Sequence, residues 1–247
     1  REVPTWFDGK MNQDERGIDC GGGCVLVCPG GAKEVQVLWT KVFEVRSGVY
    51  DIVAYVENSN FSISAPHIPY KAKLYDEAGD VIAERSGDTF AKPNELFAIF
   101  EGNMQTGGKV AVKGSIEIPN DFRWYSSTRE DQLFTVESKT LVDAERKPRL
   151  TAMLRNDSPL AYRNVDITAI IYDSRHEPIG VSSTRLVKID KNSTEKLIFT
   201  WPAPFNFVAE TEQCELPVDV MLLLDRSGSM ASESKVPPQP FLRVREA

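Results

Sequence analysis

Signals for catalysis and for membrane spanning are scarce in this sequence. Histidine occurs only twice among 247 residues, at His67 and His176, and neither lies in a motif with a nucleophile or an acid partner. A catalytic triad needs a base that is held by an orienting group, so we expect the chain not to be an enzyme. The purely apolar runs, such as Met221–Leu224, are far shorter than the ~20 residues that cross a bilayer. We therefore expect no transmembrane segment.

Clustered positive charge and phosphate-binding loops are also missing. The formal net charge is −7, and lysine and arginine form no basic cluster. Because a nucleic-acid-binding surface needs a basic patch, we expect no nucleic-acid partner. The glycines at 21–23 follow no predicted strand, so they are not a dinucleotide-binding fingerprint. Hydrophobic residues make up 41% of the chain, which is enough to fill compact cores and argues against global disorder.

Cysteine is rare and unevenly placed. Cys20, Cys24 and Cys28 fall within nine residues, whereas Cys214 is remote. In an oxidising compartment, disulfides are the default interpretation of such residues. A metal site is the alternative, although the spacing is not that of paired zinc knuckles and no histidine is near. All four are disulfide candidates, and residues 1–32 are expected to form a cysteine-rich N-terminal segment.

One hairpin pattern occurs twice along the chain. An apolar–aromatic strand end runs into Tyr75-Asp76 in the first copy and Tyr172-Asp173 in the second, and each is followed by a polar turn and a hydrophobic restart. The two Tyr-Asp pairs are 172 − 75 = 97 residues apart. A repeat of roughly 100 residues, with short strands and turn signals, has the size of one immunoglobulin-like sandwich. The chain is long enough for two such domains with short extensions.

Alternation of apolar and polar residues predicts antiparallel sheets with one solvated face. The clearest example is the stretch 109–118, in which Val110, Val112, Ile116 and Ile118 are expected to face a core. In the second half, residues 149–156 match the place that residues 52–58 have in the first.

The expected fold class is mainly β, with tandem immunoglobulin-like β-sandwiches at residues 33–132 and 133–210. These modules resemble the immunoglobulin- or fibronectin-like repeats of bacterial cell-surface proteins. Neither module contains a Cys…Trp…Cys framework. We therefore expect each sandwich to be held by its hydrophobic core, unlike antibody domains, which carry a disulfide between their sheets.

Oxygen-bearing side chains crowd the N-terminal segment. Asp8, Asn12, Asp14 and Asp19 lie on a glycine-rich stretch. Closely spaced oxygen donors on a bent loop suit a hard cation such as calcium. The alternative is a solvated, turn-rich segment stapled by a disulfide, which is how clusters of Gly, Asp and Asn commonly behave.

Residues 8–24 read Asp-Gly-x-x-Asn-x-x-Glu-x-Gly-x-Asp-Cys-Gly-Gly-x-Cys, and this pattern resembles a short module of bacterial surface proteins. That family has a cysteine just ahead of Asp-Gly, where this chain has Trp6-Phe7. The resemblance therefore implies that one of the three clustered cysteines lacks its usual partner. Either Cys214 supplies a new partner or one cysteine stays free.

The last stretch carries the sharpest chemical signal. A strand-like apolar run at 216–224 leads directly into Asp225, Ser227 and Ser229. This arrangement resembles the opening of a von Willebrand factor A domain. In that family, the Asp-x-Ser-x-Ser oxygens form part of a divalent-metal site, called MIDAS, at the carboxyl ends of a parallel sheet. Hard oxygen donors at alternate loop positions suit Mg²⁺ or Ca²⁺, and the crest of an open α/β sheet is where ligands bind.

The resemblance implies that residues 211–247 are the incomplete start of an α/β von Willebrand factor A domain. The remaining ligands of that family, a Thr and a second Asp, have no counterpart here, so we expect the chain to be part of a longer protein. An unpaired apolar strand would aggregate. Residues 218–224 are therefore expected to pair either with residues outside this sequence or with another molecule by strand donation.

Together these features predict an extracellular, cell-surface adhesion or binding protein. Its sandwiches form a stalk, and its divalent-metal-dependent head binds protein or glycan ligands. The alternative is a structural subunit of an extracellular filament or surface layer, whose partners are copies of itself. Three glycosylation sequons, at Asn60, Asn156 and Asn192, are expected to be chance matches.

Overall fold

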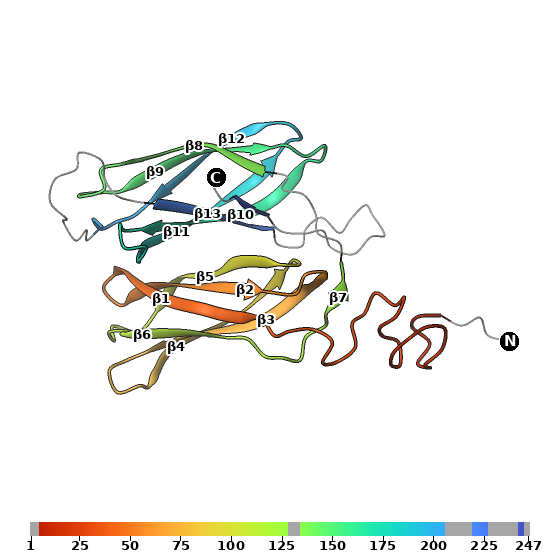
Figure 1. The fold of residues 1–247 in the computed structure, drawn as a ribbon. Helices are drawn as coiled ribbons and strands as arrows, with labels where there is room; N and C mark the ends of the chain where they lie inside the picture. The colour runs from red at the N-terminus through yellow and green to blue at the C-terminus, as the bar shows by residue number, and fades with distance from the viewer. Residues whose placement is uncertain (1–4, 128–133, 206–218, 227–241, 245–247) are drawn as a thin grey trace.

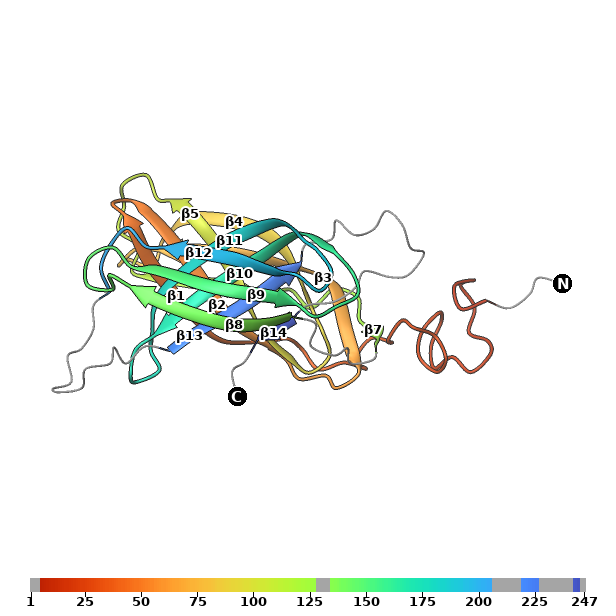
Figure 2. The ribbon, with the colours of Figure 1, turned by 90° about the horizontal axis from the view of Figure 1, so that it is seen from above.

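The computed structural model describes residues 5–127, 134–205, 219–226 and 242–244. Within these ranges the chain forms fourteen β-strands and no helix. Two sandwiches lie one on the other, so that four sheet layers are stacked (Figure 1). The N-terminal segment projects from one end of this body, beside β7, in both views (Figures 1 and 2). The prediction of a mainly β chain built from β-sandwiches is confirmed.

The first sandwich has one sheet of order β1-β2-β5 and a second of order β4-β3-β6, with the short β7 also pairing with β3. All strand pairs in it are antiparallel. Its strands are β1 (Gln36–Arg46), β2 (Val49–Asn58), β3 (Ile63–Tyr75), β4 (Val81–Ala91), β5 (Glu95–Gln105), β6 (Lys113–Glu117) and β7 (Tyr125–Ser126).

The second sandwich repeats this plan strand for strand. Its sheets have the orders β8-β9-β12 and β11-β10-β13-β14, so β8 to β13 take the places of β1 to β6. The strands are β8 (Phe134–Val142), β9 (Arg149–Asn156), β10 (Tyr162–Tyr172), β11 (Pro178–Ile189), β12 (Thr194–Thr200), β13 (Asp219–Arg226) and β14 (Leu242–Val244). The hairpin repeat read from the sequence is the connection from β3 to β4 and from β10 to β11.

Alternating side chains fill each core, as expected for half-buried strands. On β9, Leu150, Ala152 and Leu154 are fully buried, while the residues between them are more exposed. The same core of the second sandwich holds Phe134 and Tyr162, whose rings lie 5.1 Å apart. No described disulfide crosses either core, so apolar packing between the sheets supplies the stability.

Strands β2 and β10 are buried on both faces, which explains why their sequences alternate poorly. One face of each strand covers the core of its own sandwich. The other faces form a third apolar cluster, in which Val53 and Tyr55 of β2 meet Ile170 and Tyr172 of β10. The two sandwiches are therefore packed face to face through their β1-β2-β5 and β11-β10-β13 sheets, and they are not a string of separate modules.

The prediction for residues 109–118 was wrong in its first half. Val110 and Val112 are 66% and 52% exposed, whereas Ile116 is buried and Ile118 packs against the core. The reason is the preceding turn. Residues 107 and 108 are glycines with φ of 65° and 87°, which only glycine adopts readily. The turn delays the start of β6 until Lys113, which pairs with Tyr75.

The apolar run near the C-terminus also differs from expectation. The strand β13 pairs antiparallel with β10 on one side and with β14 on the other, and no parallel α/β sheet occurs in the described ranges. The expected boundary at 210/211 therefore does not separate β13 from the second sandwich. Both edges of β3 are paired, one with β4 and the other with β6. Its equivalent β10 is paired with β11 on one edge, and a strand in the place of β6 is needed on the other. The run supplies that strand, so within the described chain it is not donated to another molecule.

Candidate functional site

The N-terminal segment is anchored to the first sandwich by a short ribbon. Val27 N–H donates to the Trp124 carbonyl at 2.9 Å, and Ser126 N–H donates to the Val25 carbonyl at 2.7 Å. Because Tyr125 and Ser126 also pair with β3, the ribbon extends the sheet of the sandwich. Trp124 itself packs against the first core. Residues 5–24 are thus held as a small body at the end of the molecule.

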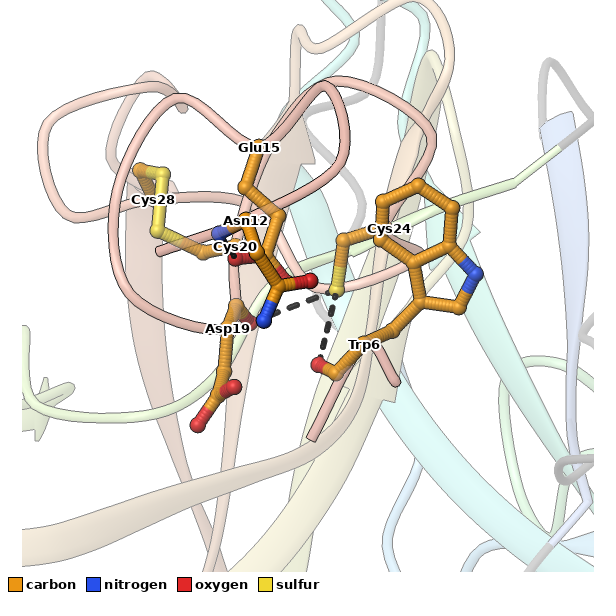
Figure 3. Close-up of a disulfide and its surroundings, with 7 residues drawn as sticks. All are labelled: Trp6, Asn12, Glu15, Asp19, Cys20, Cys24 and Cys28. Atoms are coloured by element: carbon orange, nitrogen blue, oxygen red, sulfur yellow. Dashed lines mark hydrogen bonds between the residues drawn. A yellow bond between two sulfur atoms is a disulfide. The ribbon is translucent and has the colours of Figure 1, made fainter. Parts of the chain in front are cut away.

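Its sulfur atoms are divided between one disulfide and one thiol. Cys20 and Cys28 are bonded, which confirms the disulfide prediction for these two residues. Cys24 is buried and free, and its Sγ lies 3.3 Å from the Asp19 carbonyl oxygen and 3.7 Å from that of Trp6 (Figure 3). The thiol therefore faces the backbone carbonyls of Asp19 and Trp6. Cys214 lies outside the described residues.

A carboxylate network shapes the loop of the N-terminal segment. Asp19 accepts hydrogen bonds from the backbone N–H groups of Asp8 and Gly9 at 2.9–3.0 Å. Asp8 in turn accepts from the Asn12 amide and from the N–H of Thr5. The Asn12 amide, followed by the Thr5 N–H, holds the pKa of Asp8 below its ordinary value. Three of the four predicted calcium ligands, Asp8, Asn12 and Asp19, are therefore brought together.

Asp14 lies apart from that network, at the glycine turn. A Cβ atom on Gly22 would fall 1.9 Å from the Asp14 carbonyl oxygen, and one on Gly23 would meet Asp14 Oδ1 at 3.1 Å. Gly22 also has φ of 62°. Only glycine allows this close approach of two backbone segments. Gly22 and Gly23 thus let the chain pass closely around Asp14.

Glu15 is a site residue that the sequence analysis did not single out. It is 6% exposed, and its Oε2 accepts a 3.0 Å hydrogen bond from the Asn12 N–H, while the Glu15 N–H donates to the Asn12 carbonyl at 3.2 Å. An Asn followed three residues later by Glu is the spacing of reciprocal capping. That spacing was the available signal, because it predicts that the two residues close one turn.

The predicted MIDAS-like residues are only partly described. Asp225 lies in β13, where its backbone pairs with Asp166 of β10. Ser227 and Ser229 lie outside the described residues. Among those that are described, no group of three or more His, Cys, Asp or Glu side chains is arranged to hold a metal ion.

The two histidines are separated in the structure as they are in the sequence. His67 Nδ1 lies 3.2 Å from Asp88 Oδ1 on an exposed surface, and His176 occupies the exposed tip of the β10–β11 hairpin. No helix in the described ranges has the length and apolar character needed to cross a bilayer.

The sequence matches no protein-family model and no curated protein. Solved structures with some similarity include a β-glucuronidase of glycoside hydrolase family 2, with TM-score 0.28 and 9% identity over 74% of this chain and 23% of that chain. A putative β-galactosidase from Bacteroides fragilis has TM-score 0.28 and 11% identity over 74% and 31% of the two chains. Red sea bream transglutaminase has TM-score 0.26 and 10% identity over 79% and 29%. This chain spans less than a third of each, and likenesses of this size carry no argument about its function.

Proposed function

We propose that the protein is an extracellular, cell-surface binding protein whose paired sandwiches form a rigid support for recognition of protein or glycan ligands. The observation that carries the proposal is the architecture itself. Two β-sandwiches share an apolar interface, and a segment stapled by the Cys20–Cys28 disulfide projects from one end. Disulfides persist in oxidising, extracellular environments. A fused double sandwich keeps a fixed spacing between its two ends, which suits a support.

The recognition element of this proposal is a divalent-metal loop formed by Asp225, Ser227 and Ser229. Its support is the sequence resemblance to the von Willebrand factor A opening, together with hard oxygen donors that directly follow a strand. The β13 strand ends at Arg226, so Asp225 lies at its carboxyl end in the sandwich arrangement as it would in the α/β arrangement.

The test is a calorimetric titration of the full chain with Mg²⁺ and with Ca²⁺. We expect Mg²⁺ binding and one component of Ca²⁺ binding that Asp225→Ala abolishes. The matched control is Asp219→Ala, which removes the same charge from the first residue of β13 and should leave binding intact. Binding that is unchanged by Asp225→Ala would remove the metal loop from the proposal.

The same chain also allows a test against the filament alternative. Strand donation between molecules requires the run at 218–224 to be available, and here β13 is used inside its own chain. We expect a monomer in sedimentation experiments over a wide concentration range. Concentration-dependent, end-to-end polymers would favour the structural role over the binding role.

A further inference from the structure

Two buried oxygen atoms in the N-terminal segment accept no hydrogen bond. Among the described residues, Asn12 Oδ1 and Glu15 Oε1 are the buried side-chain nitrogen or oxygen atoms without a partner. They belong to residues that are three positions apart and joined by two reciprocal hydrogen bonds. An unsatisfied buried acceptor costs about 1–3 kcal/mol, and more when it is charged. Two such oxygen atoms in one small loop therefore point to a bound group with positive charge or hydrogen-bond donors.

The orientation of the Asn12 amide is determined by its other contacts. Its Nδ2 donates to both carboxylate oxygens of Asp8, at 3.1 and 2.9 Å, and to the Lys10 carbonyl at 3.3 Å. A flipped amide would place its oxygen against the two Asp8 carboxylate oxygens and the Lys10 carbonyl oxygen. All three of these atoms are acceptors, so no hydrogen bond could form. Oδ1 is therefore the amide atom that is buried without a partner. Figure 3 shows Asn12 and Glu15 between the Cys20–Cys28 disulfide and Cys24.

The chemistry of these atoms selects the class of partner. A carboxylate oxygen and an amide oxygen are typical calcium ligands, and calcium completes its six to eight ligands with backbone carbonyls and water. The surrounding stretch, 8–19, contains four carboxylate residues and two cationic ones, so its field favours a cation. Mg²⁺ demands a stricter octahedral geometry and keeps more of its water, so it suits an irregular loop with two inner oxygen ligands less well.

We infer that Asn12 Oδ1 and Glu15 Oε1 are ligands of a Ca²⁺ ion held inside the N-terminal segment. Asp8 and Asp19, which were expected to be ligands, have a different role here. Their carboxylates accept backbone and amide N–H groups and thereby position Asn12. Asp14 is exposed and is not needed for coordination. This site is independent of the loop at Asp225 and of the proposed binding function.

Hydrogen–deuterium exchange of the full chain, with peptides resolved by mass spectrometry, tests the inference locally. Addition of Ca²⁺ should slow exchange in peptides from residues 8–24, and Glu15→Gln should weaken the apparent affinity at least tenfold. Asp14→Asn is the matched control, because it removes the same charge from the adjacent, exposed residue, and it should bind as the wild type does. The Asp225→Ala variant should also retain the effect, which separates this site from the other one.

The fold of each variant is checked through Cys24. Its buried thiol should resist alkylation in Glu15→Gln as in the wild type, since the oxygen of the introduced amide can still accept the Asn12 N–H. Absence of protection by Ca²⁺ in the wild-type chain would overturn the inference. Equal protection by Mg²⁺ would overturn the assignment of the ion. Loss of Ca²⁺ protection in Asp14→Asn, with no loss in Glu15→Gln, would overturn the assignment of the ligands.

Discussion

At the residue scale, the clearest structural feature is a pair of buried asparagines at equivalent places in the two repeats. Asn58 ends β2 and Asn156 ends β9, and both are fully buried. Asn58 Nδ2 donates to the Ile63 and Lys92 carbonyls, as Asn156 Nδ2 does to those of Leu160 and Asp190. In each repeat one amide thus ties two neighbouring loops together.

Buried hydrogen bonds also determine whether two of the three sequons can be glycosylated. The amide nitrogens of Asn60 and Asn156 are engaged in hydrogen bonds within buried side chains, so they cannot carry a glycan in the folded chain. Asn192 is exposed at a turn and is the one sequon whose side chain reaches solvent.

We expect Asn156→Ala to destabilise the chain by about 3 kcal/mol, because it removes the hydrogen bonds of a fully buried amide to the Leu160 and Asp190 carbonyls and takes the Asn156 acceptor away from the buried Ser158 N–H. Equilibrium urea unfolding measures this change. The control is Asn120→Ala, which removes only an exposed hydrogen bond to Glu34 and should stay within about 0.5 kcal/mol of the wild type. Equal effects of the two variants would contradict the role assigned to Asn156.

A second residue-scale prediction concerns acid stability. The Glu177 N–H, then the N–H and guanidinium of Arg175, hold the pKa of Asp173 below its ordinary value. A lowered folded-state pKa means that the stabilising contribution is complete above the unfolded pKa of about 3.9 and is lost as the pH falls toward the folded value. We expect Asp173→Asn to lower the melting temperature at pH 7 and to lower it less below a pH of about 3. A constant difference across this range would contradict the linkage.

At the element scale, the two hairpins share one turn geometry with different residues. Asp76 Oδ1 accepts the N–H groups of Ala78 and Asp80, and Asp173 Oδ1 accepts those of Arg175 and Glu177. Three residues after the Asp, the backbone is left-handed in both, with φ of 84° at Gly79 and 61° at His176. The left-handed conformation favours glycine, which the first turn has at Gly79, whereas the second turn has His176 in its place.

Reciprocal substitutions test this strain. Gly79→Ala should destabilise the chain by about 1 kcal/mol, and His176→Gly should stabilise it by a similar or smaller amount. No heavy atom lies within 4 Å of a Cβ added at Gly79, so conformational strain is the only expected cost. Thermal unfolding measures both changes. A stabilising Gly79→Ala would show that the turn rearranges.

At the scale of the whole molecule, the apolar interface makes two similar sandwiches behave as one body. Trp39 stacks on Tyr55 at 5.5 Å and meets the ring of Tyr172 edge-on at 6.3 Å. At the rim, Lys41 and Glu177 form an ion pair at 3.0 Å across the same boundary. Face-to-face packing of the two sheets explains why the interface strands carry apolar residues on both faces.

We expect Trp39→Ala to lower the free energy of unfolding by about 2 kcal/mol and to split one calorimetric transition into two, because it weakens the interface and leaves both cores intact. Phe61→Ala, at an exposed residue, is the control and should leave a single, unshifted transition. Two transitions in the wild type would mean that the interface does not couple the sandwiches.

Features that depend on nearby residues could be predicted from the order of the amino acids alone. Strand alternation, the Asp-led turns and the spacing of 97 residues between the Tyr-Asp pairs were enough to predict two β-sandwiches, and clustered cysteines were enough to predict a disulfide. Turn chemistry and side-chain alternation act within a few residues, so they can be read along the chain.

Features that depend on residues far apart in the chain became visible in the folded molecule. It paired Cys20 with Cys28, buried the second faces of β2 and β10 against each other, and placed β13 against β10. It also turned Glu15 inward beside Asn12. The residues of a strand do not specify which segment will cover each of its edges and faces. That segment is selected by the apolar surface that becomes buried when the whole chain packs.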